Sequence, residues 1–369
     1  MKTSISLKKI NGVLLLLFLT ATILYFGKTF LVPLCFSALL VMLLLPICRK
    51  LEKWGIGRIW ASLMGILIIV MFVGLLVWIV AAQASRISED IPKLQANTER
   101  MMLDLQSWIE SRYGMAPQEQ LAYVDNAMKN LSASAGRFFG SMLSSLMGFL
   151  TGFVLVLLYF FFIMWKREKY SDFALKLVSK ENRPEVKKEL NEITHVAENY
   201  LIGRMVSMVF LAIFYMVGFS IAGLENGILI ALVAVIPTII PYVGSFIGGF
   251  FPVAMAFLSG SPDMVLPIVL ILVTAQIIDN NIIEPMAEGE SLDLSPIFVI
   301  LALAMGGSLW GIAGMILFIP MFAIVKIICD HIPALEPYGF LMTNDVEEPM
   351  WVEKIKGWFG KGKKQDLQS

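Results

Sequence analysis

An acidic and amide-rich segment stands between two long apolar runs in the second half of the chain. It covers residues 276–290 and reads QIIDNNIIEPMAEGE. Carboxylate and amide oxygens are hard ligands, which suit a monovalent cation such as Na⁺ or a polar solute that accepts and donates hydrogen bonds. A partly buried carboxylate can also carry a proton, because burial disfavours its charge. The candidate residues for a solute or ion path are therefore Asp279, Asn280, Asn281, Glu284 and Pro285.

The charged residues around this segment are all acidic. Residues 205–325 contain no lysine or arginine, but they contain these acids: Glu225, Asp263, Asp279, Glu284, Glu288, Glu290 and Asp293. A carboxylate at membrane depth is costly unless it is paired, protonated or hydrated. Three explanations follow. The acids lie in water outside the membrane, they pair with basic residues from elsewhere in the chain, or they face a cavity and are neutralised by a proton or a metal cation.

The first explanation fits four acids that flank the apolar runs: Glu225, Asp263, Glu288 and Glu290. For Asp279 and Glu284 all three explanations stay open, because Asp279 directly ends an apolar run and Pro285 is expected to stop a regular helix. Their alternative role is structural, in a capped loop that helps the chain to turn.

The composition places these residues in a membrane protein. Among 369 residues, 57% are apolar and 16% are charged, whereas soluble proteins average roughly 45–50% and about 25%. The mean hydropathy is +0.76. We therefore expect an all-α, polytopic helical membrane protein, with the lipid bilayer as a partner. The formal net charge of zero gives no basic field for nucleic acid.

Membrane spans need roughly 20 apolar residues, and the expected spans are 10–26, 30–48, 59–82, 142–165, 205–224 and 264–278. The bias of lysine and arginine toward one side predicts that both termini are cytoplasmic. The expected organisation is N-terminal spans in 1–83, an extracytoplasmic helical hairpin in 84–141, a span and cytoplasmic helix in 142–204, a transport core in 205–330, and an amphipathic tail in 331–369. The apolar stripes of the outer hairpin pack on each other or on another subunit.

Two apolar segments of the core are interrupted. The first, 225–258, contains IPTIIPYVGSFIGGFFP, with hinge candidates Pro237, Pro241, Gly244, Gly248 and Gly249. The second, 294–328, has hinge candidates Gly306, Gly307 and Gly311. Their arms look short for spanning, so we expect two re-entrant or broken hairpins, the first turning at 241–244 and the pair flanking a transport site. Tight helix packing through small residues is the alternative.

Signatures of catalysis are missing from the sequence. There is no GxxxxGK[ST] loop for ATP, no HExxH motif and no CxxC or Cys/His cluster for structural zinc. We therefore expect no enzyme, no resident metal and no cofactor beyond a coupling ion, H⁺ or Na⁺. A membrane scaffold without transport is the alternative of another class, although a scaffold does not need broken hairpins.

Two stretches carry a resemblance to a known family. They are IPTIIPYVGSFIGGFFP and QIIDNNIIEPMAEGESLDLSPIFVILALAMGGSLWGIAGMILFIP. Their Pro-Tyr-x-Gly hairpin, Asn…Pro loop, Leu-Ser-Pro start and glycine-rich last segment resemble the AI-2E family of permeases, also called PerM-like, over nearly the whole chain. The family pattern is closer to Leu-His-Pro, so Ser295 replaces a histidine whose role does not carry over.

The resemblance implies a secondary transporter with about eight membrane segments, a homo-oligomer, in a bacterial cytoplasmic membrane. Family members are described as exporters of the quorum-sensing signal autoinducer-2 and as Na⁺(Li⁺)/H⁺ antiporters. Export of a small polar solute such as autoinducer-2 is the leading hypothesis. An antiporter that uses Asp279 and Glu284 for a monovalent cation is the alternative.

Overall fold

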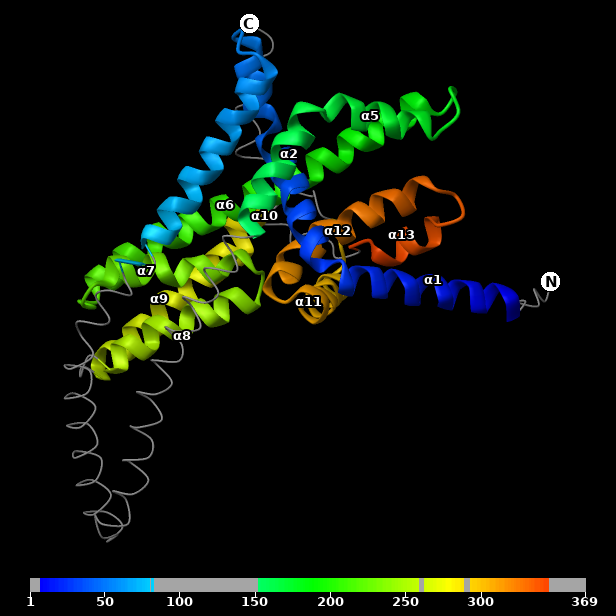
Figure 1. Cartoon of the computed structure of the whole chain (residues 1–369). Coiled ribbons are helices and arrows are strands. Elements are labelled where there is room, and N and C mark those ends of the chain that lie inside the picture. The colour runs from blue at the N-terminus through cyan, green and yellow to red at the C-terminus, as the bar shows by residue number, and fades with distance from the viewer. Residues whose placement is uncertain (1–6, 80, 83–151, 259–261, 289–292, 345–369) are drawn as a thin grey trace, which may run out of the picture. The chain divides into compact units, whose positions relative to one another are not determined.

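The computed structural model describes residues 7–79, 81–82, 152–258, 262–288 and 293–344 (Figure 1). The described part of the chain is helical and contains no β-strand. The expected outer hairpin, 84–141, and the charged and aromatic part of the expected tail, 345–369, lie outside the described residues. The chain divides into two compact units. One combines 1–67, 152–203 and 285–369, and the other combines 68–151 and 204–284.

Five helices of the described part are long and apolar enough to cross a membrane: Lys28–Lys53, Arg58–Ile79, Arg183–Ile221, Val265–Ala287 and Ile312–His331. Shorter apolar helices accompany them, at Leu14–Phe26, Gly152–Trp165, Gly227–Ile239, Val243–Phe257 and Pro296–Trp310. This inventory confirms the expected all-α, polytopic membrane protein. The helices extend beyond the expected apolar spans because their charged ends stay helical.

In the first unit, the N-terminal helices α1 (Leu7–Phe26) and α2 (Lys28–Lys53) are separated by Gly27 alone. A Cβ at Gly27 would meet the carbonyl oxygen of Ile23 at 2.6 Å, so this tight junction needs glycine. Short helices α5 (Arg167–Lys176) and α13 (Glu336–Met342) also belong to this unit, together with the first part of α6 (Arg183–Ile221). Helix α6 runs without a break from the segment expected in the cytoplasm into the span expected at 205–224.

A helical hairpin, α11 (Pro296–Trp310) and α12 (Ile312–His331), completes the first unit. The chain turns at Gly311, whose φ of 62° favours glycine. Gly306 and Gly314 face each other so closely that a Cβ on either would collide with the other's backbone carbonyl. The expectation that both arms are short is wrong for α12, because its 20 residues are enough to cross a membrane.

The second unit holds the rest of α6 and a second helical hairpin. The hairpin comprises α7 (Gly227–Val235), the 3₁₀ turn η1 (Ile236–Ile239) and α8 (Val243–Leu258). Helices α7, α8 and α9 (Val265–Ile278) lie side by side (Figure 1). Large buried side chains from these helices and α6 form its core: Tyr215, Phe219, Ile230, Leu272 and Ile268.

The turn between α7 and α8 is close-packed. Backbone at Ile240 is extended, and Tyr242 has a left-handed φ of 60°. A Cβ at Gly244 would collide with the carbonyl of Pro237, and one at Gly248 would collide with the carbonyl of Ala234. Two of the glycines proposed as hinges are thus positions of close backbone contact between the hairpin's arms.

Candidate functional site

The polar segment that follows α9 continues the helix instead of ending it. Residues Asp279–Ile283 form a π turn, η3, and α10 (Glu284–Glu288) follows directly. In that turn the Glu284 backbone N–H donates to the Asp279 carbonyl, five residues earlier. The alternative of a capped loop is therefore wrong, and Pro285, which was expected to stop a regular helix, lies within α10. The ring of Pro285 would crowd the carbonyl four residues back in a regular α-helix, and a wider π turn is one way to accommodate it.

The π turn changes which side chains share a face. Residues five apart on an α-helix point about 140° away from each other, since each residue turns about 100°. A turn closed by a hydrogen bond across five residues brings such a pair closer to one side. Asp279 and Glu284 accordingly both reach α6. Functional sites are frequent at π turns of this kind.

Three polar contacts connect α6 with α9 and its extension, all within the second unit. The Tyr215 hydroxyl accepts from the Gln276 amide at 3.2 Å. The Ser207 hydroxyl lies 2.6 and 2.7 Å from the two carboxylate oxygens of Asp279. The Arg204 guanidinium pairs with Glu284 at 2.8 Å. We call these six residues the polar ladder; their order along the two helices is antiparallel.

Asp279 is the least conventional member of the polar ladder. Its side chain belongs to a membrane-spanning helix and the residue is only 2% exposed. Among the described residues, the Ser207 hydroxyl is its hydrogen-bond donor, and no ion pair engages it. A hydroxyl donates one hydrogen bond, whereas an ionised carboxylate can accept about four, so most acceptor sites of Asp279 have no donor among the described residues. Such a group needs a proton, a cation or water to be tolerated at membrane depth.

Glu284 is paired with a basic residue from elsewhere in the chain, which was the second of the three explanations for the acids. Its partner Arg204 is buried and stands one residue before the stretch that lacks lysine and arginine. With Arg204 and Glu284 cancelling, an ionised Asp279 leaves the polar ladder with one uncompensated negative charge. Arg204 and Ser207 were not among the predicted site residues, although their spacing of three residues on a helix places them on one face.

The remaining candidates lie apart from the polar ladder. Asn280 and Asn281 are exposed, and the Asn281 amide donates to its own helix at the Ile277 carbonyl, at 2.8 Å. Pro285 is half-buried in α10. The hinge candidates Pro237, Pro241, Gly244, Gly248, Gly249, Gly306, Gly307 and Gly311 lie in the two hairpins. Glu225 and Asp263 are exposed, which agrees with the explanation that they face water.

A separate charged cluster lies in the first unit. The buried Lys326 ammonium of α12 pairs with Asp330 one turn later, at 2.7 Å, and with Asp293 ahead of α11, at 2.8 Å. Asp293 also accepts from the Asn344 backbone N–H at 3.3 Å. Since Lys326 gives both carboxylates an ion-pair partner, we assign the cluster to holding the base of the α11–α12 hairpin.

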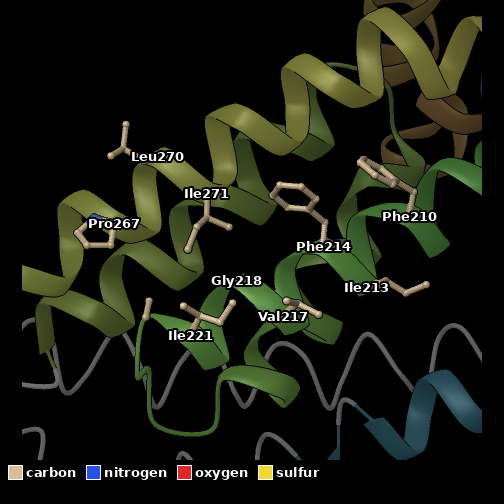
Figure 2. Close-up of a pocket in the computed structure, with 10 residues that line it drawn as sticks. Phe210, Ile213, Phe214, Val217, Gly218, Ile221, Pro267, Leu270 and Ile271 are labelled. Atoms are coloured by element: carbon tan, nitrogen blue, oxygen red, sulfur yellow. The ribbon is translucent and has the colours of Figure 1, made fainter.

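The polar ladder has an apolar neighbour on the same two helices. A groove of about 800 Å³ runs between α6 and α9, and Figure 2 shows Phe210, Phe214 and Ile271 on its walls. The helices approach closely at Gly218, where a Cβ would lie 2.6 Å from the Ile271 side chain. None of the predicted site residues lines this groove, and its apolar walls do not suit a polar solute.

The Arg204–Glu284 pair makes a prediction about stability. Arg204→Met leaves a half-buried carboxylate without its partner and is expected to cost about 3 kcal/mol, the low end for broken buried pairs. The double variant Arg204→Met with Glu284→Gln should recover at least half of that loss, because no unpaired charge remains. Thermal unfolding in detergent measures the cycle. Equal destabilisation of the single and double variants would show that the ion pair is not what Arg204 contributes.

Comparison with known proteins adds independent information. The family model described as "AI-2E family transporter" matches residues 14–334. The chain is 26% identical over 341 residues to the Bacillus subtilis protein named "Putative transport protein YueF", covering 85% of this chain and 89% of the relative. It is also 26% identical over 324 residues to "Putative permease PerM" of Escherichia coli K12, covering 84% and 90%.

The family match covers the α6, α9 and α10 segments that carry the polar ladder, as well as both hairpins. Together with the helical membrane architecture, this match over most of the chain shows that the protein belongs to the AI-2E transporter family.

Proposed function

We propose that this protein is a secondary transporter of a small polar solute, and that Asp279 binds the proton or cation that drives it. The supporting observation is the buried Asp279 carboxylate on a membrane span, with a serine hydroxyl and no ion pair among the described residues. A carboxylate in that position changes its charge when it gains or loses a small cation. Pairing of Arg204 with Glu284 leaves Asp279 as the exchangeable group.

The proposed solute is autoinducer-2 or a similar small furanosyl diol, moved outward. Its hydroxyl groups need hydrogen-bond acceptors and donors at close spacing. The polar ladder offers the Asp279 carboxylate, the Ser207 and Tyr215 hydroxyls and the Gln276 amide along one interface between two helices. The family description "AI-2E family transporter" supports this class of solute.

Exchange of Na⁺ or Li⁺ for H⁺ is the second candidate. It is supported by the single uncompensated negative charge of the polar ladder and by oxygen donors beside it, the Asp279 carboxylate and the Ser207 hydroxyl. A monovalent cation and a proton would compete for the same carboxylate. Both candidates therefore use Asp279, and they differ in whether a polar solute or a monovalent cation is moved.

The experiment that separates these functions is flux in proteoliposomes with a pH-sensitive dye inside. A pH gradient is imposed, and Na⁺, Li⁺ or autoinducer-2 is then added to parallel samples, with K⁺ and sucrose as matched controls. Proton movement triggered by Na⁺ or Li⁺ supports the antiporter. Autoinducer-2 flux that responds to the gradient supports the exporter. If the protein moves none of them, both transport proposals are wrong, and the result agrees with the alternative of a membrane scaffold without transport.

Ser207→Ala provides a graded test of the same site. Removing the hydroxyl takes away the hydrogen bond to Asp279 but leaves its carboxylate, so we expect about a tenfold fall in flux instead of complete loss, the worth of one hydrogen bond to a charged group. The matched control is Ser220→Ala on the same helix, whose exposed hydroxyl donates to the Met216 carbonyl of that helix. Equal flux in both variants would remove Ser207 from the mechanism.

The proposed setting is the bacterial cytoplasmic membrane, with both termini in the cytoplasm and several copies in a homo-oligomer. The lysine and arginine bias of the sequence supports the orientation. Membrane-impermeant thiol labelling of single cysteines placed near each end would test it. If the reagent labelled these cysteines from outside intact cells, the termini would lie outside the cytoplasm and the proposed orientation would be wrong.

A further inference from the structure

A second cavity, of about 480 Å³, lies in the first unit, along α5. Its walls are charged and aromatic. They include the lysines Lys166, Lys169 and Lys176, and the rings of Trp165 and Phe173. This mixture differs from the apolar groove on α6 and α9. The cavity shares no residue with the polar ladder, so the proposed transport site does not account for it.

The cavity has an excess of positive charge. Arg58 on its wall pairs with Glu168 at 2.5 Å. The Arg58 guanidinium holds the pKa of the Glu168 carboxyl below its usual range, so this pair is neutral as a whole at pH 7. Lys166, Lys169 and Lys176 then have only the Asp172 carboxylate against them. Within the described residues, no ion pair engages any of the three lysines.

The surroundings of the cavity are those of a membrane surface. Trp165 ends the apolar helix Gly152–Trp165, and its ring lies 4.0 Å from the Lys166 ammonium. Tryptophan and lysine at the end of an apolar helix are typical of the boundary between lipid and water. The cavity therefore lies where lipid headgroups would be.

Helix α5 itself is amphipathic, and within the described part of the chain its apolar face is left uncovered. No α5 residue is buried. Tyr170 and Phe173 on the helix and Leu177 at its end follow each other at helical spacing, and more than half of each is exposed. A short helix with exposed apolar residues beside lysines suits the membrane interface, where its apolar side enters the lipid.

We propose that this cavity binds the headgroup phosphate of an anionic phospholipid, with its acyl chains along the exposed apolar face of α5. Lysine ammoniums bind phosphate as point charges, and the three lysines place several around one cavity. The adjacent apolar face is what favours a lipid over a free phosphate ion, which has no use for Tyr170, Phe173 or Leu177. The site would anchor α5 to the membrane surface.

The test uses the full-length protein purified in detergent, titrated with phosphatidylglycerol, with phosphatidylcholine of the same chains, and with inorganic phosphate. Bound lipid is counted by native mass spectrometry, and the thermal unfolding midpoint is followed in parallel. Wild type should retain phosphatidylglycerol and be stabilised by it. The double variant Lys169→Gln with Lys176→Gln should bind it about thirtyfold more weakly, since each lysine near an anionic lipid contributes roughly fivefold.

The matched control is Lys180→Gln with Lys187→Gln, which removes the same charge from exposed positions outside the cavity. It should bind phosphatidylglycerol like wild type. Because all four lysines are exposed, every variant should unfold at the wild-type midpoint before lipid is added. Equal weakening in both double variants, or equal binding of both lipids, would overturn the site. Stabilisation by inorganic phosphate alone to the same extent would overturn the assignment to a lipid.

Discussion

Asp279→Asn is expected to abolish coupled transport, reducing flux in proteoliposomes to that of empty vesicles while the protein still folds. An amide has nearly the shape of the carboxylate and still accepts the hydrogen bond from Ser207. It does not take up a proton or balance a cation in the same way, so the charge change at the polar ladder is lost. The flux assay should be run with folding checked by thermal unfolding in detergent.

The matched control is Asp263→Asn, which makes the same chemical change at an exposed residue of the 3₁₀ turn Pro262–Met264. Its flux should stay within about twofold of wild type, as surface substitutions usually have small effects. Full flux in Asp279→Asn would contradict the proposed role of the carboxylate and leave Asp279 as a packing residue. Equal loss in both variants would show that the effect does not belong to the polar ladder.

Gly306→Ala is expected to cost about 3 kcal/mol or more of stability, because it forces apart the two arms of the α11–α12 hairpin. The added Cβ would meet the backbone carbonyl of Gly314 and the Phe318 ring, the latter at 3.0 Å. Backbone cannot move aside as a flexible side chain can. We expect a low yield of monodisperse protein and a clearly lower unfolding midpoint.

Gly74→Ala is the control for that substitution. Gly74 lies in the helix Arg58–Ile79, and no described residue lies within 4 Å of a Cβ built there. Alanine favours a helix by about 1 kcal/mol over glycine, so this variant should be neutral or slightly more stable. A Gly306→Ala protein as stable as Gly74→Ala would mean that the two arms do not pack as closely as the structure shows.

Much of the helical architecture could be predicted from local patterns. Long apolar runs predicted the spans that became α2, α6 and α9, since a helix is the structure that satisfies its own backbone in lipid. Proline and glycine marked the turns beside Tyr242 and at Gly311, where the backbone adopts positive φ. The helix ends were less predictable, because polar residues beyond an apolar run can stay helical when they are solvated or paired.

The candidate site was only partly predictable, because its geometry depends on contacts between distant segments. Asp279 and Glu284 could be identified as acids without a nearby base, but their partners Ser207 and Arg204 lie more than 70 residues earlier. The two asparagines and Pro285 read locally as a loop. The structure instead shows a π turn, which spacing rules based on 3.6 residues per turn do not anticipate.

The central claim is that Asp279 exchanges a proton when substrate or cation binds, and infrared difference spectroscopy of the reconstituted protein tests it directly. Na⁺, Li⁺ and autoinducer-2 would each be perfused at constant pH. We expect that at least one of them converts a protonated carboxyl band into a carboxylate band in wild type and in Asp263→Asn, and that Asp279→Asn lacks this change. A conversion that persists undiminished in Asp279→Asn, or no conversion in wild type with any of the three, would contradict it.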